Sequence, residues 1–179
     1  MAQHPKEFSA QSIRRKVFSL PDTYYGEECN ISLQSSSITR RSASDGEPLR
    51  FDNIGISFCG GGHISSEINL SPQTVSAGDF ELFFPGSIYR LNEISEDCEL
   101  IGIAISPAIL DEILQGPDRT FFNRVRTNIR VRLEEDEQLM FRQMAGLYLQ
   151  TLQLYGETSK IGRAMTASIL QLALQVCSS

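Results

Sequence analysis

The chain is poor in the residues that build metal centres. Its 179 residues include two histidines, four cysteines and no tryptophan. The cysteines, Cys29, Cys59, Cys98 and Cys177, lie far apart, and no C-x-x-C pair occurs. Tetrahedral zinc sites need clusters of such ligands, which this sequence does not offer. We therefore expect no metal and no other cofactor, and we interpret the cysteines as small buried hydrophobic residues.

Basic charge and long apolar runs are also scarce. The chain has 16 Lys and Arg against 22 Asp and Glu, a net charge of -6, and a sequence pI of about 5.0. A surface that holds a phosphate backbone is basic, so this segment is not expected to bind DNA itself. No apolar run is long enough to cross a bilayer, and residues 1–10 lack the apolar core of a signal peptide. We expect a cytoplasmic protein with no membrane partner.

The first two-thirds of the chain contains a series of short apolar segments separated by turn residues. Clusters of Gly, Pro, Ser and Asp, such as 42–48 and 60–62, divide the segments from one another. Many short strands at this spacing predict an antiparallel sandwich or jelly roll rather than βαβ units. The predicted strands cover residues 29–34, 50–59, 63–70, 80–84, 87–92 and 99–105.

The last third of the chain predicts helices. A short helix is expected near 107–114, with Ser106 as its N-cap. Residues 124–133 then alternate apolar side chains with arginines, which predicts a half-buried strand. The arginines, which we expect to face solvent or carboxylates rather than nucleic acid, are Arg124, Arg126, Arg130 and Arg132. Two helices follow, 134–155 and 159–179, and their short connection predicts antiparallel packing.

Residues 78–91 carry the most informative pattern. Gly78-Asp79 is a turn, residues 80–84 form a short apolar strand, Pro85-Gly86 ends it, and residues 87–91 alternate again. This arrangement resembles the second half of the cupin motif, in the form found in the amino-terminal sensor domains of AraC-type transcription regulators. In many cupins a metal-binding histidine closes the motif, whereas this chain has Tyr89. The resemblance in fold therefore remains, whereas the resemblance to a metal enzyme is weaker.

The resemblance implies a mainly β fold with helices at the carboxyl end. Residues 1–133 would form a cupin-like antiparallel β-barrel, or jelly roll, and residues 134–179 an antiparallel helix pair that serves as a dimerisation segment. Such a domain binds a small-molecule effector in the barrel and controls a DNA-binding domain. DNA would be bound only through that helix-turn-helix domain, which is absent from this chain. We accordingly expect a sensor and not an enzyme.

Strand alternation predicts the side chains that line the barrel. In residues 53–58 the even positions are apolar and should point inward, and His63 and Glu67 share one face of the next strand. The choice of face is sensitive, because a slip of one residue reverses every side chain. The predicted ligand-binding residues are Ile56, Phe58, His63, Glu67, Phe83 and Tyr89.

The final helix has two apolar stripes rather than one. A helix that packs on its own domain needs a single stripe, so two stripes predict two partners. A homodimer is the interpretation we favour, and its predicted interface consists of Leu170, Ala173, Leu174 and Cys177. In the alternative, the helix lies between the barrel and the preceding helix, and both stripes belong to the core.

Two other functions stay open at this point. The first is a small cupin enzyme, an isomerase or a dioxygenase, whose only candidate metal ligands or acid–base groups are His63, Glu67 and Tyr89. Cys59 is a further candidate nucleophile, but no orienting partner for it can be identified. The second is an interaction module with a filled barrel. A cavity lined by polar and aromatic side chains would separate the sensor from the filled module.

Overall fold

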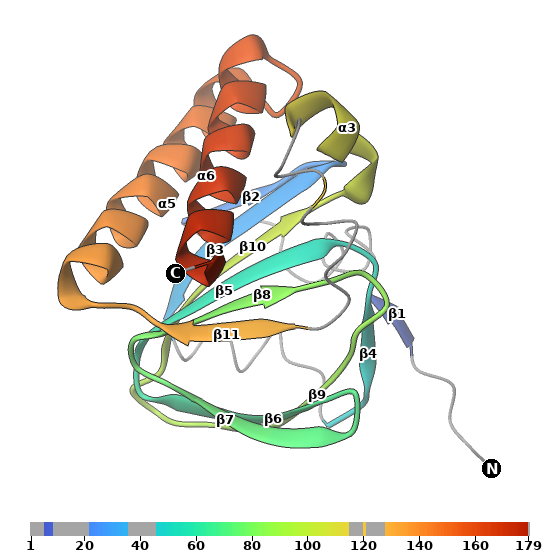
Figure 1. Ribbon diagram of the computed structural model, residues 1–179, viewed down its shortest axis with the longest axis vertical. Helices are drawn as coiled ribbons and strands as arrows, with labels where there is room; N and C mark the ends of the chain where they lie inside the picture. The colour runs from blue at the N-terminus through green and yellow to red at the C-terminus, as the bar shows by residue number, and fades with distance from the viewer. Residues whose placement is uncertain (1–5, 9–21, 36–45, 115–119, 121–127, 179) are drawn as a thin grey trace.

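The computed structural model describes residues 6–8, 22–35, 46–114, 120 and 128–178. Within these ranges the chain forms three layers, and Figure 1 shows a helix pair, a larger sheet and a smaller sheet in that order. The mainly β fold with helices at the carboxyl end is as predicted. The strands form two facing sheets of a cupin-like sandwich rather than one closed barrel.

The smaller sheet, sheet A, has five strands. In spatial order they are β1 (Lys6–Phe8), β4 (Leu49–Phe51), β9 (Ile88–Ile94), β6 (His63–Ile68) and β7 (Ser71–Ser76). Only the β1–β4 pair is parallel. The turn between β6 and β7 contains Asn69 and Leu70, whose φ angles are 50° and 68°, as in a type I′ hairpin. The strand predicted over 63–70 therefore ends two residues early, and β7 was not predicted.

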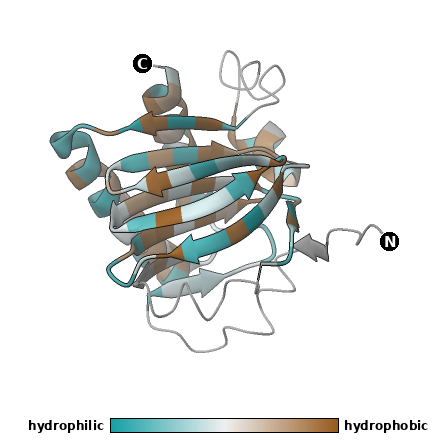
Figure 2. Cartoon of the chain, turned by 90° about the horizontal axis from the view of Figure 1, so that it is seen from below, coloured by the Kyte–Doolittle hydropathy of each residue, from teal (hydrophilic) through white to brown (hydrophobic). Residues whose placement is uncertain are grey.

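The larger sheet, sheet B, is antiparallel throughout and has six strands. In spatial order they are β11 (Ile129–Arg132), β8 (Asp79–Phe83), β5 (Ile54–Gly61), β10 (Glu99–Ile105), β3 (Cys29–Ser35) and β2 (Thr23–Tyr25). Seen from below, where sheet A lies nearest the viewer, hydrophilic and hydrophobic residues alternate along the strands (Figure 2). The predicted strand 50–59 divides into β4 and β5. Arg124 and Arg126, which belong to the predicted strand 124–133, lie outside the described residues.

Capping side chains set the helix boundaries. The short predicted helix is a 3-10 turn, η1 (Pro107–Ile109), followed by α3 (Leu110–Ile113), and the Ser106 side chain accepts a hydrogen bond from the backbone N of Ala108 at 3.3 Å. Helix α5 (Glu135–Tyr155) begins with a reciprocal capping box between Glu134 and Glu137. Helix α6 (Lys160–Ser178) begins after Ser159, whose Oγ accepts from the Gly162 backbone N at 2.9 Å. None of the described helices is long and apolar enough to cross a membrane.

The main hydrophobic core lies between the helix pair and sheet B. Phe141 of α5 packs edge-on against Phe58 and Phe80, with ring centroids 5.5 and 5.1 Å apart. Each of these edge-to-face pairs adds roughly 0.5–1.5 kcal/mol to the stabilisation that burial provides. The helix pair therefore stabilises the fold by covering one whole face of sheet B.

The buried positions of α6 correct the predicted dimer interface. Leu170 and Ala173 are 0% exposed and Leu174 is 4% exposed within a single chain, while Cys177 is half-buried. All four contact the main core, as does Ile169 of the other predicted stripe. Apart from Ile161, which is 51% exposed, the residues of both stripes belong to the main core or pack against it, so their apolar surface requires no second copy. The alternative, in which the helix lies between the strands and the preceding helix, is the one that the structure shows.

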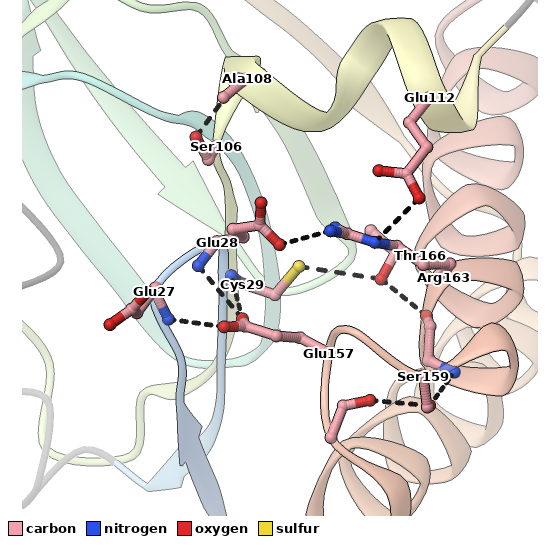
Figure 3. Close-up of polar contacts among 12 residues, drawn as sticks. Glu27, Glu28, Cys29, Ser106, Ala108, Glu112, Glu157, Ser159, Arg163 and Thr166 are labelled. Carbon is pink, nitrogen blue, oxygen red and sulfur yellow. Dashed lines mark hydrogen bonds and ion pairs between the residues drawn. The ribbon is translucent and has the colours of Figure 1, made fainter.

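A buried carboxylate ties the helix pair to the sheet. Glu157, between α5 and α6, accepts hydrogen bonds from the backbone N atoms of Glu27, Glu28 and Cys29 at 2.7, 3.1 and 2.8 Å (Figure 3). A Cβ on Gly26 would collide with this carboxylate, so the turn has no room for a side chain there. The contact fixes the loop between the helices against the β2–β3 turn.

Two further contacts reinforce this joint. Arg163 of α6 pairs with Glu28 at 2.6 Å and with Glu112 of α3 at 3.3 Å. Beneath it, the Thr166 hydroxyl lies 3.7 Å from the Cys29 Sγ and 3.1 Å from the hydroxyl of Tyr148. Burial raises the pKa of the Cys29 thiol. Cys29 is thus a packed, protonated residue, as predicted, and not a reactive thiolate.

Candidate functional site

The two faces of sheet B differ sharply in side-chain size. On the face toward the helices, Ile103 and Ile105 are buried in the main core. On the face toward sheet A, Gly102 and Ala104 are partly exposed, although β10 is a central strand. A Cβ built on Gly102 would meet no atom of the described residues within 4 Å. The described residues therefore leave the space between the two sheets open above the middle of β10.

Small polar residues surround this open space. One row of cross-strand partners on the inner face of sheet B is Glu81, Ser57, Gly102 and Ser32. Asn30, on the same face of β3, is 4% exposed. Its Oδ1 atom and the Oγ atom of Ser32 are buried and have no hydrogen-bond partner among the described residues. Buried polar atoms without partners cost free energy, so these two atoms favour a ligand that donates hydrogen bonds.

Glu81 of β8 is the central polar group of the inner face. It is 4% exposed, and the Gln73 side chain of β7 donates a hydrogen bond to its Oε1 atom at 3.0 Å. The Gln73 amide nitrogen also lies 3.4 Å from the Oγ of Ser66 on β6. Burial raises the pKa of Glu81 to about 7, and the nearby Arg130 and the Gln73 hydrogen bond only partly oppose this shift. The carboxyl group therefore changes its charge near neutral pH.

Arg130 closes one side of the space between the sheets. Its guanidinium extends from β11, at the edge of sheet B, to β7, at the edge of sheet A. It donates to the Thr74 backbone O at 2.6 Å and to the Gln73 Oε1 at 2.8 Å. Its Nε lies 3.7 Å from the Glu81 Oε1. The next arginine, Arg132, pairs with a carboxylate at 3.4 Å, so both described arginines of the predicted row serve as carboxylate partners, as expected.

Three aromatic side chains lie together in the same space. Phe51 of β4 stacks on Phe83 of β8 with a centroid distance of 5.2 Å. Tyr89 of β9 meets both rings edge-on, at 5.9 Å from Phe51 and 6.2 Å from Phe83. Glu81 and Phe83 are two residues apart on one strand and face the same side, about 7 Å apart along the chain. An aromatic surface therefore adjoins the buried carboxylate.

Apolar residues fill the other end of the inter-sheet space. Cys59 and Cys98 share a buried cluster with Ile64, Val75 and Ile94. A side-chain hydrogen bond with Cys98, together with burial, raises the pKa of the Cys59 thiol far above its ordinary value. Cys59 is consequently protonated and does not act as the nucleophile considered from the sequence. The inter-sheet space is apolar at this end, polar in the middle and aromatic at the other end.

Two of the six predicted ligand-binding residues, Phe83 and Tyr89, lie in this space. Ile56 and Phe58 do not, because they pack in the main core, where Phe58 contacts Phe141 of α5. The alternation along β5 was identified correctly, but its apolar face turns toward the helices. The interior was therefore assigned to the wrong side of sheet B.

His63 and Glu67 are also corrected, since they lie on the outer face of sheet A. The buried residues of β6 are Ile64, Ser66 and Ile68, so the two residues of opposite parity point away from sheet B. His63 is exposed, and Glu67 pairs with Arg90 at 3.5 Å. Because Tyr89 faces inward, the three candidate groups of a cupin enzyme do not meet. Across the described ranges, no group of three or more His, Cys, Asp or Glu could hold a metal ion.

Several residues of the site were not predicted. Glu81 has a signal in the sequence, since it is a charged residue inside the apolar run 80–84, and an interior carboxylate breaks such a run. Gln73 has none, because Pro72 and the surrounding polar residues do not predict a strand. The remaining unpredicted residues of the site are Asn30, Ser32, Phe51, Ser57, Ser66, Gly102 and Arg130.

The comparisons with known proteins agree with this fold. No protein-family model matches the chain, and no curated protein sequence does. Among solved structures, an apo variant of ToxT from Vibrio cholerae has a TM-score of 0.51 and 13% sequence identity. The similarity covers 86% of this chain and 58% of the ToxT chain, so this chain spans less than two-thirds of that protein.

Weaker similarities are found to CuxR, described as an AraC-like transcriptional activator, and to ToxT with an unsaturated fatty acid bound. For CuxR the TM-score is 0.45 and the identity 11%, over 85% of this chain and 49% of the other. For fatty-acid-bound ToxT the values are 0.42 and 10%, over 76% and 61%. The fold shared with ToxT agrees with the fold expected from the resemblance seen in residues 78–91. At these identities the likeness shows a fold and no ligand.

Proposed function

We propose that this chain is the effector-sensing and dimerisation domain of an AraC-type transcription regulator, and that its effector binds between the two sheets. The observation that carries the proposal is the inner face of sheet B, where small residues leave open space above Gly102. A filled interaction module would need large apolar side chains there, as on the opposite face. Partnerless polar atoms and adjoining aromatic rings are typical of small-molecule sites.

The position of β11 supports a route from the effector to the helix pair. Arg130 of β11 contacts the buried Glu81, and the strand continues through Leu133 directly into α5. The Leu133 backbone N donates to the Gly78 backbone O at 2.9 Å, which ties this junction to the turn before β8. An effector that changes the Arg130 contacts would act on the start of α5. Such an effector must bind two arrangements of the domain with different affinity.

We place the dimer contact on the exposed face of α5 rather than on the buried stripes of α6. Leu147 and Leu154 are seven residues apart and 52% and 74% exposed, and Met140 continues the spacing by another seven. No charged residue occurs in residues 143–155. A two-fold contact sets the same patch of each copy against itself, and an uncharged patch can do so without bringing like charges together.

Ligand screening by thermal shift tests the sensing proposal. Gly102→Val fills the open space and meets no atom of the described residues there, so the variant should fold normally. Compounds that raise the melting temperature of the wild-type protein should have no effect on this variant. Compounds that stabilise both proteins equally, or a complete lack of stabilising compounds in a broad fragment collection, would contradict an effector site between the sheets.

Light scattering tests the dimer. The wild-type chain should be dimeric at tens of micromolar, and Leu147→Glu combined with Leu154→Glu should give a folded monomer. The matched control is Leu70→Glu, which changes an 82% exposed leucine away from α5 and should leave the dimer intact. A monomeric wild-type chain, or a double variant that stays dimeric, would rule out this contact.

A further inference from the structure

The charges around the inter-sheet space are unevenly distributed. The charged side chains that strands β5 to β10 turn toward it are Asp79 and Glu81, both on β8. Two arginines at the edge strand β11, Arg130 and Arg132, are their partners. Arg132 is mostly exposed, and Arg130 is one-third exposed, whereas Glu81 is buried. The negative charge thus lies deep in the space and the positive charge at its edge.

The pairing of Glu81 is incomplete. Arg130 approaches only to 3.7 Å, which is beyond hydrogen-bond distance, and it gives its two short hydrogen bonds to Thr74 and Gln73 instead. Gln73 and Arg130 both reach the same carboxylate oxygen, Oε1, so Oε2 takes part in neither contact. Burial of a carboxylate is costly unless a positive charge pairs with it closely, and no positive charge of the described residues approaches this one more closely than Arg130 does. The raised pKa of Glu81 agrees with this geometry.

The surroundings of Glu81 favour one chemical class of ligand. An ammonium or amidinium group would donate hydrogen bonds to the carboxylate and supply the missing charge. Its apolar part would lie against Phe83 and Tyr89, and aromatic faces also attract cations. A carboxylate ligand would instead be repelled, because like charges at this distance are unfavourable in a buried site.

We propose that the effector is a small organic cation with an aromatic or other apolar group, bound between the sheets with its nitrogen on the Glu81 carboxylate. This inference rests on the proposed function, since it names the ligand class of the same site. The cation's nitrogen lies at Oε2, the carboxylate oxygen that neither Gln73 nor Arg130 contacts. The bound positive charge weakens the attraction between Glu81 and Arg130 and so acts on the strand that leads into α5.

Three probes of matched shape test the inference by titration calorimetry at about pH 8, where Glu81 is ionised and the amine is still protonated. They are 2-phenylethylammonium, the neutral 2-phenylethanol and the anion 3-phenylpropionate. The ammonium probe should bind at least about tenfold more tightly than the alcohol, and the anion should not bind. Glu81→Gln, which keeps the size of the side chain, should remove this preference. Glu67→Gln, the matched change on the outer face of sheet A, should leave it unchanged.

The pH dependence of the wild-type chain gives a second readout that does not need a folded variant. Lowering the pH to about 5 protonates Glu81 and should weaken ammonium binding at least about tenfold. The other titratable or charged groups near Glu81 are Asp79 on the same strand, Arg130 on β11 and Tyr89 on β9, whereas β5, β6 and β7 contribute the neutral Ser57, Ser66 and Gln73. Burial raises the pKa of the Tyr89 hydroxyl above its ordinary value, so the tyrosine keeps its proton between pH 5 and 8.

Two results would overturn the cation inference: equal or tighter binding of the alcohol or the anion, and no binding by any of the three probes. The first would leave the proposed function standing, since a ligand would still bind between the sheets. If none of the three probes binds, the fragment screen that compares the wild-type chain with Gly102→Val still tests the proposed function independently.

Discussion

Alternate residues of the same strands form the two faces of sheet B, yet one face is tightly packed and the other is open. Toward the helices, large apolar side chains such as Phe58, Phe80 and Ile103 are fully packed. Toward sheet A, small residues such as Ser57 and Gly102 leave space, and buried oxygens of Asn30 and Ser32 have no hydrogen-bond partner among the described residues. Stability therefore comes mainly from the helix face, which leaves the inner face free to bind. A sensor needs both a packed face for stability and an open face for binding, because an open site contributes little packing of its own.

The largest difference between the faces should appear on truncation. Phe58→Ala removes a buried ring that contacts Phe141, and it should lower the free energy of unfolding by about 3–5 kcal/mol. Ser57→Ala, the neighbouring residue on the inner face, should change it by less than about 0.5 kcal/mol. Urea unfolding followed by circular dichroism measures both values. Similar costs for the two variants would show that the inner face is packed as well.

The pH dependence of stability should isolate Glu81. Its pKa is raised from 4.5 to about 7 in the folded chain, so the folded state holds the proton more tightly than the unfolded state. This contribution is complete below pH 4.5 and is lost as the pH rises through 7, up to about 3 kcal/mol in all. Urea unfolding at pH 5 and pH 8 should show this loss in the wild type and not in Glu81→Gln. An identical pH dependence of the two proteins would contradict the burial of this carboxylate.

Two glycines on the inner face should respond differently to a new side chain. Gly102→Val enters open space and improves strand propensity, so stability should stay the same or rise by up to about 1 kcal/mol. Gly55→Val meets the Phe83 ring, which lies 3.2 Å from the position of the new Cβ, and should cost about 1–3 kcal/mol. Thermal unfolding compares the two. A large cost for Gly102→Val would mean that the space above β10 is filled.

The outer face of sheet A should be the least sensitive. His63 is exposed there and Glu67 makes one partly exposed ion pair with Arg90. His63→Ala and Glu67→Gln should each change the free energy of unfolding by less than about 0.5–1 kcal/mol and leave ligand binding unaltered. A loss of ligand binding in either variant would return these residues to the site, where sequence alternation had placed them.

The sequence predicted the secondary-structure elements better than it predicted which elements pair or pack with one another. Most strands, both long helices and the turns at Gly78 and Gly86 were found, because alternation, caps and positive-φ glycines are local signals. The hairpin strand β7 was missed, since Pro72 and Gln73 do not have the composition of a strand. Its formation depends on pairing with β6, which no local signal reports.

The site was harder to predict than the fold for one physical reason. Alternation shows which residues share a face, but in a three-layer fold each side of the middle sheet is covered by a different layer. Ile56 and Phe58 were assigned to the ligand space because apolar residues were expected inside a barrel. The apolar face of sheet B packs against the helix pair instead of facing sheet A. The prediction that Leu170 and Leu174 form a dimer interface was wrong for the same reason. It did not take into account that the helix pair and sheet B share a core, in which both leucines are buried.

The most direct test of the account is an NMR titration of the ¹⁵N-labelled chain with 2-phenylethylammonium. Alternate residues of β10 should separate into two classes. The amide signals of Gly102 and Ala104, with those of Glu81 and Phe83, should move in proportion to binding, while those of Ile103 and Ile105 should move far less. Shifts confined to the helix face or the outer face of sheet A, or no shifts at millimolar probe, would contradict a ligand site between the sheets.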